Sequence, residues 1–403
     1  MKIHRTIPFS VKDRVVVENH IPVFSIGKHK VGRGQPCFIT AEIGINYDGN
    51  WDTALKMIDV SADAGCDGVK FQVFRSEHMY IPKAGALVTA GGKKVNIHAL
   101  LKNVELDYNW LQKLRGHAKK RGLEFFASVC DEASADALYK AGTSAFKITS
   151  YEMTHIPLIE HVSNRGLPLI ISCGGNTMDE VVEAMRATQQ AGQKNILLMH
   201  CIAKYDAPLK ALHLNVLKTL QLQFPDAVIG YSDHSADPII APVAAIALGA
   251  KMIEKHITLN RRSPGPDHSF ALEPQQLAHM VRIIRKTEAD LAAGKTVLID
   301  TRVLGRSDRN TFPEEAYIKH YASRMCVAAS DIGKGEKFTS KNIVVLRPGE
   351  QGEKYLRDAV YPNMYSRLIG KKDGNTYVAT KTIQAGEIIT WETIMQKVIL
   401  EKT

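Results

Sequence analysis

Chemically capable side chains recur near the ends of eight short apolar stretches in this sequence of 403 residues. A stretch that only filled a hydrophobic core would end in Val, Ile or Leu. Residues two apart on a strand project from the same face, so the spacing predicts one shared polar ligand site. The side chains are Glu42, Asn46, Lys70, Gln72, Ser128, Lys147, Ser150, Ser172, His200, Ser232, His234, Glu254 and His256.

His234 and His256 stand in successive stretches and could bind one divalent metal as neutral imidazoles. Glu42 would be a direct or water-mediated partner. His200 is a third candidate, or else a hydrogen-bonded histidine of the core. Two imidazole ligands leave coordination positions open for substrate and water, which favours a catalytic metal over a structural one.

Lys70 and Lys147 each lie between apolar neighbours, which favours anion binding over a solvated surface lysine. The alternative is the Schiff-base lysine of a metal-free aldolase. The serine hydroxyls and the backbone N–H groups of the segment SCGGN (172–176) would complete a cradle for phosphate and carboxylate groups.

The apolar stretches alternate with helix-like segments that close on Gly, which predicts an α/β fold with a parallel sheet. Eight such units predict a closed (β/α)8 TIM barrel, whose active site lies at the C-terminal ends of the strands. An open doubly wound sheet is the alternative, but the first turn lacks the glycine fingerprint of a dinucleotide site. The stretches are 37–46, 66–73, 123–130, 145–150, 168–174, 196–201, 227–234 and 251–258.

The remaining segments predict a second, smaller domain. Residues 75–105 form a long connection of the kind that often serves as a lid. DIGKGEKFTSKNI and TIQAGEIITWETI, near the C-terminus, form a weak internal repeat of short strands and turns. We expect an N-terminal extension with a hairpin that closes the barrel floor, the barrel, a linker and a mainly β domain, at residues 1–36, 37–295, 296–320 and 321–403.

Composition excludes several other classes of protein. The net charge is +10, but Lys and Arg are spread along the chain, so we expect a basic surface that attracts anionic substrates and no nucleic-acid partner. No apolar run of about 18 residues and no signal peptide is evident, which predicts a cytoplasmic protein without a membrane span. The six scattered cysteines predict buried, reduced thiols and no disulfide framework.

Several motifs in order resemble the sialic acid synthase (N-acetylneuraminate synthase) family over nearly the whole chain from about residue 25. They are AEIGIN (41–46), VKFQ, FKITSYE (146–152), HCIAKY (200–205), YSDHS (231–235), EKHIT (254–258), PGPDHSFALEP (264–274) and LRPG (346–349). SVCDE, SYEMTH and CIAKY are most similar to the spore-coat polysaccharide branch. The resemblance implies a TIM barrel followed by an antifreeze-like (SAF) domain, in a domain-swapped homodimer. It also implies a transferase that condenses phosphoenolpyruvate with an N-acylated mannosamine-type sugar and releases phosphate.

The same resemblance implies a role for each matching residue. The metal, with Mn2+ favoured over Mg2+ or Co2+, would be held by His234 and His256. The catalytic residues would be Glu42, Lys70, Lys147 and Glu152. Phosphoenolpyruvate would contact Lys70, Ser128, Lys147, Ser150, Ser172 and Ser232. The sugar would contact Gln72, Glu152, Tyr205, Asp267 and, reaching across the dimer toward the N-acyl group, Arg347.

Ala203, Lys204 and Asp206 depart from the family pattern where the sugar is expected. The acceptor therefore stays open between N-acetylmannosamine, its 6-phosphate and a deoxy diamino sugar. Rival functions are a Schiff-base aldolase acting through Lys70 or Lys147, a non-catalytic glycan-binding protein, and a synthase acting on a phosphorylated pentose or tetrose.

Overall fold

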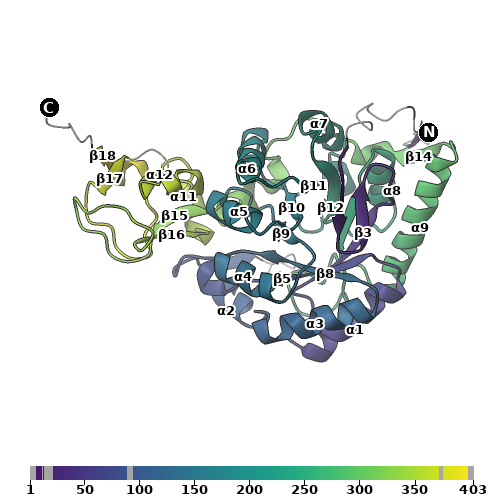
Figure 1. The fold of residues 1–403 in the computed structure, drawn as a ribbon, viewed down its shortest axis with the longest axis horizontal. Coiled ribbons are helices and arrows are strands. Elements are labelled where there is room, and N and C mark those ends of the chain that lie inside the picture. Colours follow the sequence, from purple (N-terminus) through teal and green to yellow (C-terminus); the bar gives the residue numbers. More distant parts are fainter. Residues whose placement is uncertain (1–5, 11, 13–20, 89–93, 372–374, 398–403) are drawn as a thin grey trace.

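A closed barrel of eight parallel strands forms the centre of the molecule (Figure 1). The computed structural model describes residues 6–10, 12, 21–88, 94–371 and 375–397. Each predicted apolar stretch contributes one strand, so the predicted TIM barrel is confirmed and the open sheet is wrong. The strands are β4 (Phe38–Gly44), β5 (Gly68–Val73), β8 (Glu124–Val129), β9 (Phe146–Ile148), β10 (Leu169–Ser172), β11 (Ile196–Cys201), β12 (Val228–Asp233) and β13 (Met252–His256).

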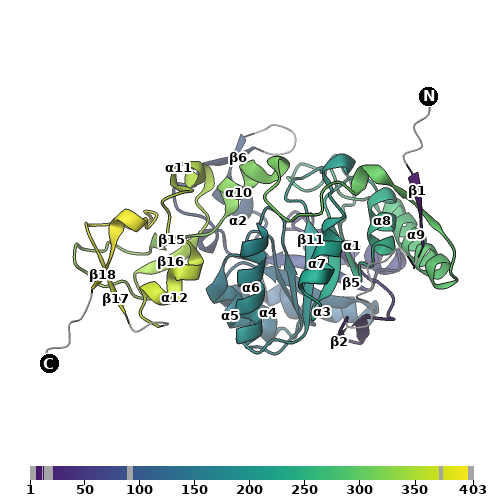
Figure 2. The same ribbon diagram turned by 90° about the horizontal axis from the view of Figure 1, so that it is seen from above.

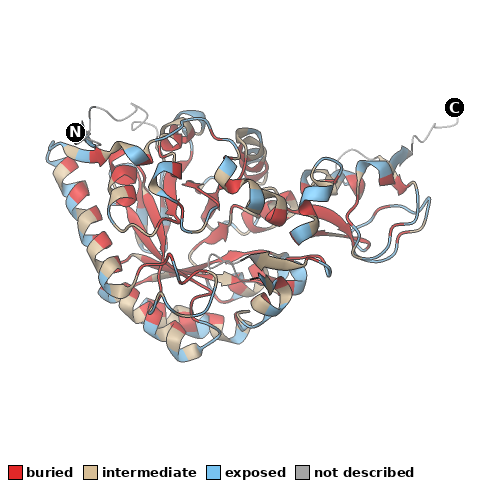
Figure 3. Cartoon of the chain, turned by 180° about the vertical axis from the view of Figure 1, so that it is seen from behind, coloured by how far each residue is buried: buried red, intermediate tan, exposed pale blue. Residues whose placement is uncertain are grey.

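Helices surround the barrel and bury their apolar faces against it (Figure 3). Several begin at a side chain that accepts a backbone N–H, as Asn50, Asp131 and Thr177 do. Such caps fix where each helix starts, and therefore where the preceding strand-to-helix loop ends. The helices are α1 (Trp51–Asp63), α3 (Tyr108–Lys120), α4 (Glu132–Lys140), α5 (Ile156–Ser163), α6 (Met178–Gln190), α7 (Val216–Gln223), α8 (Ile240–Ala247) and α9 (Pro274–Ala292).

The predicted hairpin closes the floor of the barrel. It consists of β2 (Val23–Ile26) and β3 (His29–Gly32), and Phe24 and Val31 join the apolar cluster at the base of the barrel strands. Outside the barrel, β1 (Thr6–Phe9) pairs antiparallel with β14 (Val297–Asp300).

The stretch expected to be a linker is structured. Residues 296–320 contain β14, two short 3-10 helices, η4 (Thr301–Val303) and η5 (Pro313–Glu315), and most of α10 (Ala316–Ala322). The division into these four segments stays a prediction.

A small module with short strands follows α10 at one side of the barrel (Figure 1). The sequence repeat is visible here as two successive hairpins. The N–H of Ile332 donates to the carbonyl of Ile383 at 2.8 Å, and the N–H of Ile383 donates back at 2.9 Å. The elements are β15 (Met325–Ala328), β16 (Ile343–Leu346), η6 (Gly349–Gln351), α11 (Gly352–Tyr355), η7 (Pro362–Met364), α12 (Tyr365–Leu368), β17 (Thr376–Ala379), η8 (Trp391–Thr393) and β18 (Ile394–Lys397).

This module docks on the long connection that follows β5 (Figure 2). The N–H of Arg347 donates to the carbonyl of Met79 at 2.7 Å, and the N–H of Ile81 donates to the carbonyl of Arg347 at 3.0 Å. The connection contains η2 (Ser76–His78), β6 (Ala86–Val88), β7 (Lys94–Asn96), α2 (Ile97–Lys102) and the segment 89–93, which lies outside the described residues.

All six cysteines are free and buried, as predicted. Within the described part of the chain, no helix combines the length and apolar character needed to cross a membrane.

Candidate active site

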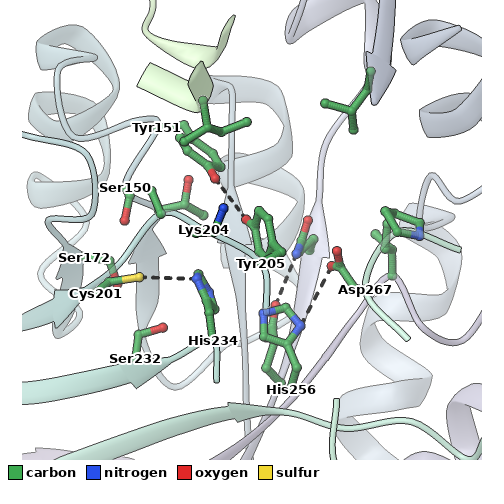
Figure 4. Close-up of a pocket in the computed structure, with 18 of the residues that line it drawn as sticks. Ser150, Tyr151, Ser172, Cys201, Lys204, Tyr205, Ser232, His234, His256 and Asp267 are labelled. Carbon is green, nitrogen blue, oxygen red and sulfur yellow. Dashed lines mark hydrogen bonds and ion pairs between the residues drawn. The ribbon is translucent and has the colours of Figure 1, made fainter. Parts of the chain in front are cut away.

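A cavity of about 620 Å³ lies at the C-terminal ends of the barrel strands (Figure 4). The structure brings most of the predicted site residues together in its lining, whereas Ser128 and Glu152 lie behind the wall. The predicted residues that line it are Glu42, Lys70, Gln72, Lys147, Ser150, Ser172, Tyr205, Ser232, His234, His256, Asp267 and Arg347.

Two buried lysines from different strands meet at the bottom of this cavity. Lys70 Nζ, on β5, lies 3.0 Å from Glu42 Oε2 and donates to Ser128 Oγ at 2.8 Å. Lys147 Nζ, on β9, donates to Ser172 Oγ at 2.6 Å. Both ammonium groups therefore sit beside serine hydroxyls, as an anion-binding cradle requires.

Glu254 links the two lysines, a role that the sequence analysis did not assign to it. Its Oε1 lies 3.3 Å from Lys147 Nζ and 3.5 Å from Lys70 Nζ, and it accepts a hydrogen bond from Ser232 Oγ at 2.9 Å. The available signal was its spacing of two from His256, which places both side chains on the inner face of β13.

The charges of this cluster are unevenly distributed. Burial raises the pKa of Glu42, against the opposing effect of Lys70. Burial also acts to raise the pKa of Glu254, but Lys147 and Lys70 outweigh it and hold that pKa low. Glu254 therefore stays ionised between two cations, whereas Glu42 can take up a proton far more readily, which suits an acid–base group.

The two predicted metal ligands lie side by side, with ring centroids 5.3 Å apart. His234 Nδ1 donates to the carbonyl of Ile202 at 2.8 Å, which leaves the lone pair of Nε2 free. His256 Nδ1 is buried without a hydrogen-bond partner, and Asp267 Oδ2 lies 3.8 Å from it. Burial lowers the pKa of both histidines, so both are neutral imidazoles.

This donor set fits a divalent cation. The unpartnered ring nitrogen of His256 and the free nitrogen of His234 are the atoms that would hold it. The described residues contain no cluster of three or more His, Cys, Asp or Glu side chains around a common point, so the remaining positions would be open to ligands other than protein. His200, the third candidate, is instead a core histidine, since its Nε2 donates to the carbonyl of Leu212 at 2.7 Å.

The predicted phosphate-binding role of the SCGGN backbone is wrong for its two glycines. The N–H of Gly174 donates to Ser150 Oγ at 2.9 Å, and the N–H of Gly175 donates to Glu315 Oε1 at 2.6 Å. Glu315 also accepts the N–H of Ala203 and pairs with Arg309 at 3.0 Å. A serine hydroxyl and a carboxylate of the chain itself therefore occupy these two donors.

Glu152 and Arg347 pair with each other at the wall of the cavity. Glu152 is fully buried, and its Oε1 accepts from Arg347 and, at 3.1 Å, from Arg324. Arg347 lines the cavity of its own chain, where its guanidinium lies 5.3 Å from the ring centroid of Tyr80. The backbone of Arg347 pairs with the connection after β5 of the same chain, and this holds the side chain there. Its reach across a dimer stays a prediction.

The pH dependence of stability should report the Glu152 pair. Burial acts to raise the pKa of Glu152, but Arg347 and Arg324 outweigh it and lower that pKa. The ionised form therefore stabilises the fold above about pH 4.3, the unfolded value, and this contribution is lost as the pH falls further. Urea unfolding should give Glu152→Gln a lower free energy of unfolding than the wild type at pH 7. The difference between the two free energies should narrow below about pH 4.3. A difference in the free energy of unfolding that does not change with pH would contradict an ionised Glu152 paired with the two arginines.

Aromatic and acidic side chains also line the cavity (Figure 4). Tyr151 donates its hydroxyl hydrogen to the Tyr205 hydroxyl at 3.0 Å, and the Tyr205 ring lies 4.7 Å from the ring of His234. Burial raises the pKa of Asp267 to about 6. Gln72 Nε2 donates to Glu42 Oε1 at 3.2 Å, which orients that carboxylate.

A buried ion pair lies on the outer side of the two strands that carry the histidines. Lys255 Nζ donates to Asp233 Oδ2 at 2.6 Å and to the carbonyl of Asp237 at 3.0 Å. Lys255→Met leaves Asp233 buried and unpaired, which should lower the free energy of unfolding by about 3–5 kcal/mol. Urea unfolding measures this loss. Lys295→Met, which removes an exposed partner of Asp290, is the control and should cost less than about 1 kcal/mol; equal losses would refute the argument.

Comparison with known proteins agrees with this geometry. The sequence model of the NeuB family matches residues 57–296. The chain is 42% identical to the spore coat polysaccharide biosynthesis protein SpsE of Bacillus subtilis over 93% of this chain and 98% of that protein. The crystal structure of SpsE has a TM-score of 0.82, covering 94% of this chain and 100% of that one.

Two further relatives have names that state a reaction. The chain is 31% identical to N,N'-diacetyllegionaminic acid synthase of Campylobacter jejuni, over 87% of this chain and 98% of that protein. It is 31% identical to human N-acetylneuraminate-9-phosphate synthase, over 85% and 90%. From its matching sequence model, the extent of these similarities and its shared architecture, the chain belongs to the NeuB family.

Proposed function

We propose that this protein is a nonulosonic acid synthase, a transferase that condenses phosphoenolpyruvate with an N-acylated mannosamine-type sugar and releases phosphate. The observation that carries the proposal is the meeting of Lys70 and Lys147, with their serine partners, beside the imidazoles of His234 and His256 in one cavity. The relatives named as synthases of legionaminic acid and of N-acetylneuraminate 9-phosphate support it.

The family is metal-dependent, and we assign the metal to His234 and His256, with Mn2+ favoured over Mg2+ or Co2+. Bound there, a divalent cation would supply Lewis-acid polarisation of the sugar carbonyl.

The lysines bind and orient phosphoenolpyruvate. Its phosphate and carboxylate groups would take the hydrogen bonds that Lys70 and Lys147 now give to Glu254, Ser128 and Ser172. This fixes the enolic C3 toward the sugar, where it attacks C1 and leaves a cationic C2. Charge that develops in a buried site is stabilised most by preorganised groups of this kind.

Glu42 is the residue best placed to handle the proton of the water that adds at C2. Its carboxylate lines the cavity, is oriented by Gln72, and has a pKa raised by burial. Glu152, the other predicted catalytic carboxylate, is held between Arg324 and Arg347 behind the wall. Water addition gives a tetrahedral intermediate whose collapse expels phosphate.

A phosphate-release assay with phosphoenolpyruvate and a panel of mannosamine-type acceptors tests the proposal. We expect one phosphate per product, with a product mass equal to both substrates plus water minus phosphoric acid. Release of no phosphate with any acceptor would reject the synthase. Borohydride trapping of Lys70 or Lys147 on a keto substrate would establish the aldolase instead.

The assembly and the domain division belong to the same proposal. We infer a homodimer and an SAF-type domain within residues 321–403, whose two hairpins and docking on the barrel are described above. Sedimentation equilibrium measures the dimer directly.

A further inference from the structure

The outer part of the cavity has an apolar wall that the proposed chemistry does not use. Ile97, Leu100 and Leu101 face it from α2, at the spacing that places side chains on one face of a helix. This apolar wall consists of Met79, Leu87, Ile97, Leu100, Leu101 and Ile318.

The apolar wall is backed by packed core. Met79, Ile97 and Leu101 belong to the buried cluster that joins the barrel mouth to the C-terminal module, and Leu87, Leu100 and Ile318 pack against this cluster. The wall is therefore held in place by its packing, as the surface of a selective pocket must be.

Beyond the deep lysines, the charges of the cavity lining do not suit a second phosphate. Asp206, Asp267 and Glu314 bring carboxylates to the lining, and the guanidinium of Arg347 is already paired with Glu152. Among the described lining residues this leaves Lys204, which is exposed, as the cation beyond the deep lysines. A phosphomonoester carries close to two negative charges, and its burial against apolar side chains without partners is strongly unfavourable.

We propose that the acceptor is an uncharged acylamino sugar that carries apolar substituents at the end remote from its aldehyde. A 6-deoxy methyl group and a second acyl methyl are substituents of this kind. The aldehyde must lie beside the histidines and the deep lysines, on the strands, so the far end of the sugar extends toward the elements above them, where the wall stands. Leu87, Ile97, Leu100 and Leu101 then determine specificity. This inference rests on the proposed synthase function.

The size of the expected preference follows from burial. A single methyl or methylene group in a fitted apolar pocket discriminates by about 10–200-fold. We therefore expect kcat/KM for a 2,4-diacetamido-2,4,6-trideoxy acceptor to exceed that for N-acetylmannosamine by at least about 10-fold. N-acetylmannosamine 6-phosphate should be the poorest of the three.

The test compares these three acceptors with the full-length, metal-loaded enzyme by phosphate release, and their binding by titration calorimetry. Leu100→Lys places a cation on the wall and should lower kcat/KM for the deoxy acceptor about 10-fold or more while raising that for the 6-phosphate. KM for phosphoenolpyruvate should stay unchanged. Leu222→Lys, at a position 61% exposed on the outer helix α7, is the matched control and should leave the order of acceptors unchanged.

The outcomes separate the two proposals. If the 6-phosphate is turned over as well as the deoxy acceptor or better, the inference is overturned and the synthase function stands. The same holds if Leu100→Lys does not alter the ratio of kcat/KM for the deoxy acceptor to that for the 6-phosphate. If no acceptor leads to phosphate release, the proposed synthase function is rejected. Calorimetry still tests the role of the apolar wall, because binding of the 6-phosphate as tight as that of the deoxy acceptor, or tighter, overturns the inference.

Discussion

Lys147→Met is expected to lower kcat/KM for phosphoenolpyruvate by about 10^2–10^3-fold or more, the effect of removing one preorganised charge donor. Lys147 is buried at the bottom of the cavity, and its ammonium group is held by Ser172 and Glu254. Met keeps much of the side-chain volume and removes the charge. It also leaves Glu254 with one cation fewer, so the incoming anion would meet a less compensated carboxylate.

The measurement is steady-state phosphate release under saturating acceptor. Lys140→Met, an exposed lysine at the end of α4, should behave as the wild type. A Lys147→Met enzyme that keeps its circular dichroism spectrum and works within 10-fold of the wild type would show that Lys147 does not bind the phosphoenolpyruvate anion. A Schiff-base aldolase also predicts a large loss, but it predicts a borohydride adduct that the synthase does not form.

Chelation should abolish activity, and His256→Ala should lower kcat by about 10^3-fold or more, because loss of a Lewis acid removes several kcal/mol of transition-state stabilisation. The buried Nδ1 of His256 has no hydrogen-bond partner, and the free ring nitrogen of His234 lies beside that imidazole. Both imidazoles are neutral because burial lowers their pKa values, so no proton must leave before a cation binds.

Two measurements besides activity check this assignment. Metal analysis of the purified wild-type protein should find a divalent cation that His256→Ala has lost. Added Mn2+ should raise the unfolding temperature of the chelator-treated wild type, because a ligand at 100 times its Kd stabilises the folded state by about 2.7 kcal/mol. His256→Ala should show no such rise, whereas His279→Ala, on the outer helix α9, should match the wild type. Full activity after exhaustive chelation would remove the metal from the scheme.

The barrel and most of the cavity lining were predictable because parallel strands buried on both faces read as continuous apolar runs. A Lys or His that interrupts such a run has few structural explanations. The sequence therefore indicated Lys70, Lys147 and the histidine pair without knowledge of their contacts.

The contacts themselves depend on strand register, which one sequence does not contain. Glu254 joins the two lysines because β13 closes the barrel against β4, with His256 opposite Glu42. The glycine N–H groups after β10 were assigned to phosphate because the carboxylate that takes one of them, Glu315, lies 140 residues further along the chain. Glu152 follows β9 closely enough to suggest the cavity, but two arginines hold it behind the wall.

The pairing of the Arg347 backbone with residues 79–81 has a practical consequence for redesign. Backbone hydrogen bonds join two segments that lie far apart in the sequence. One carries most of the apolar wall, and the other carries Arg347. Transplanting another substrate range onto this barrel would therefore require exchanging both segments together. A chimaera that took either segment alone would leave main-chain donors and acceptors of the other segment without partners. The opening of the cavity would then lose its structure, and the intended change of substrate range would fail.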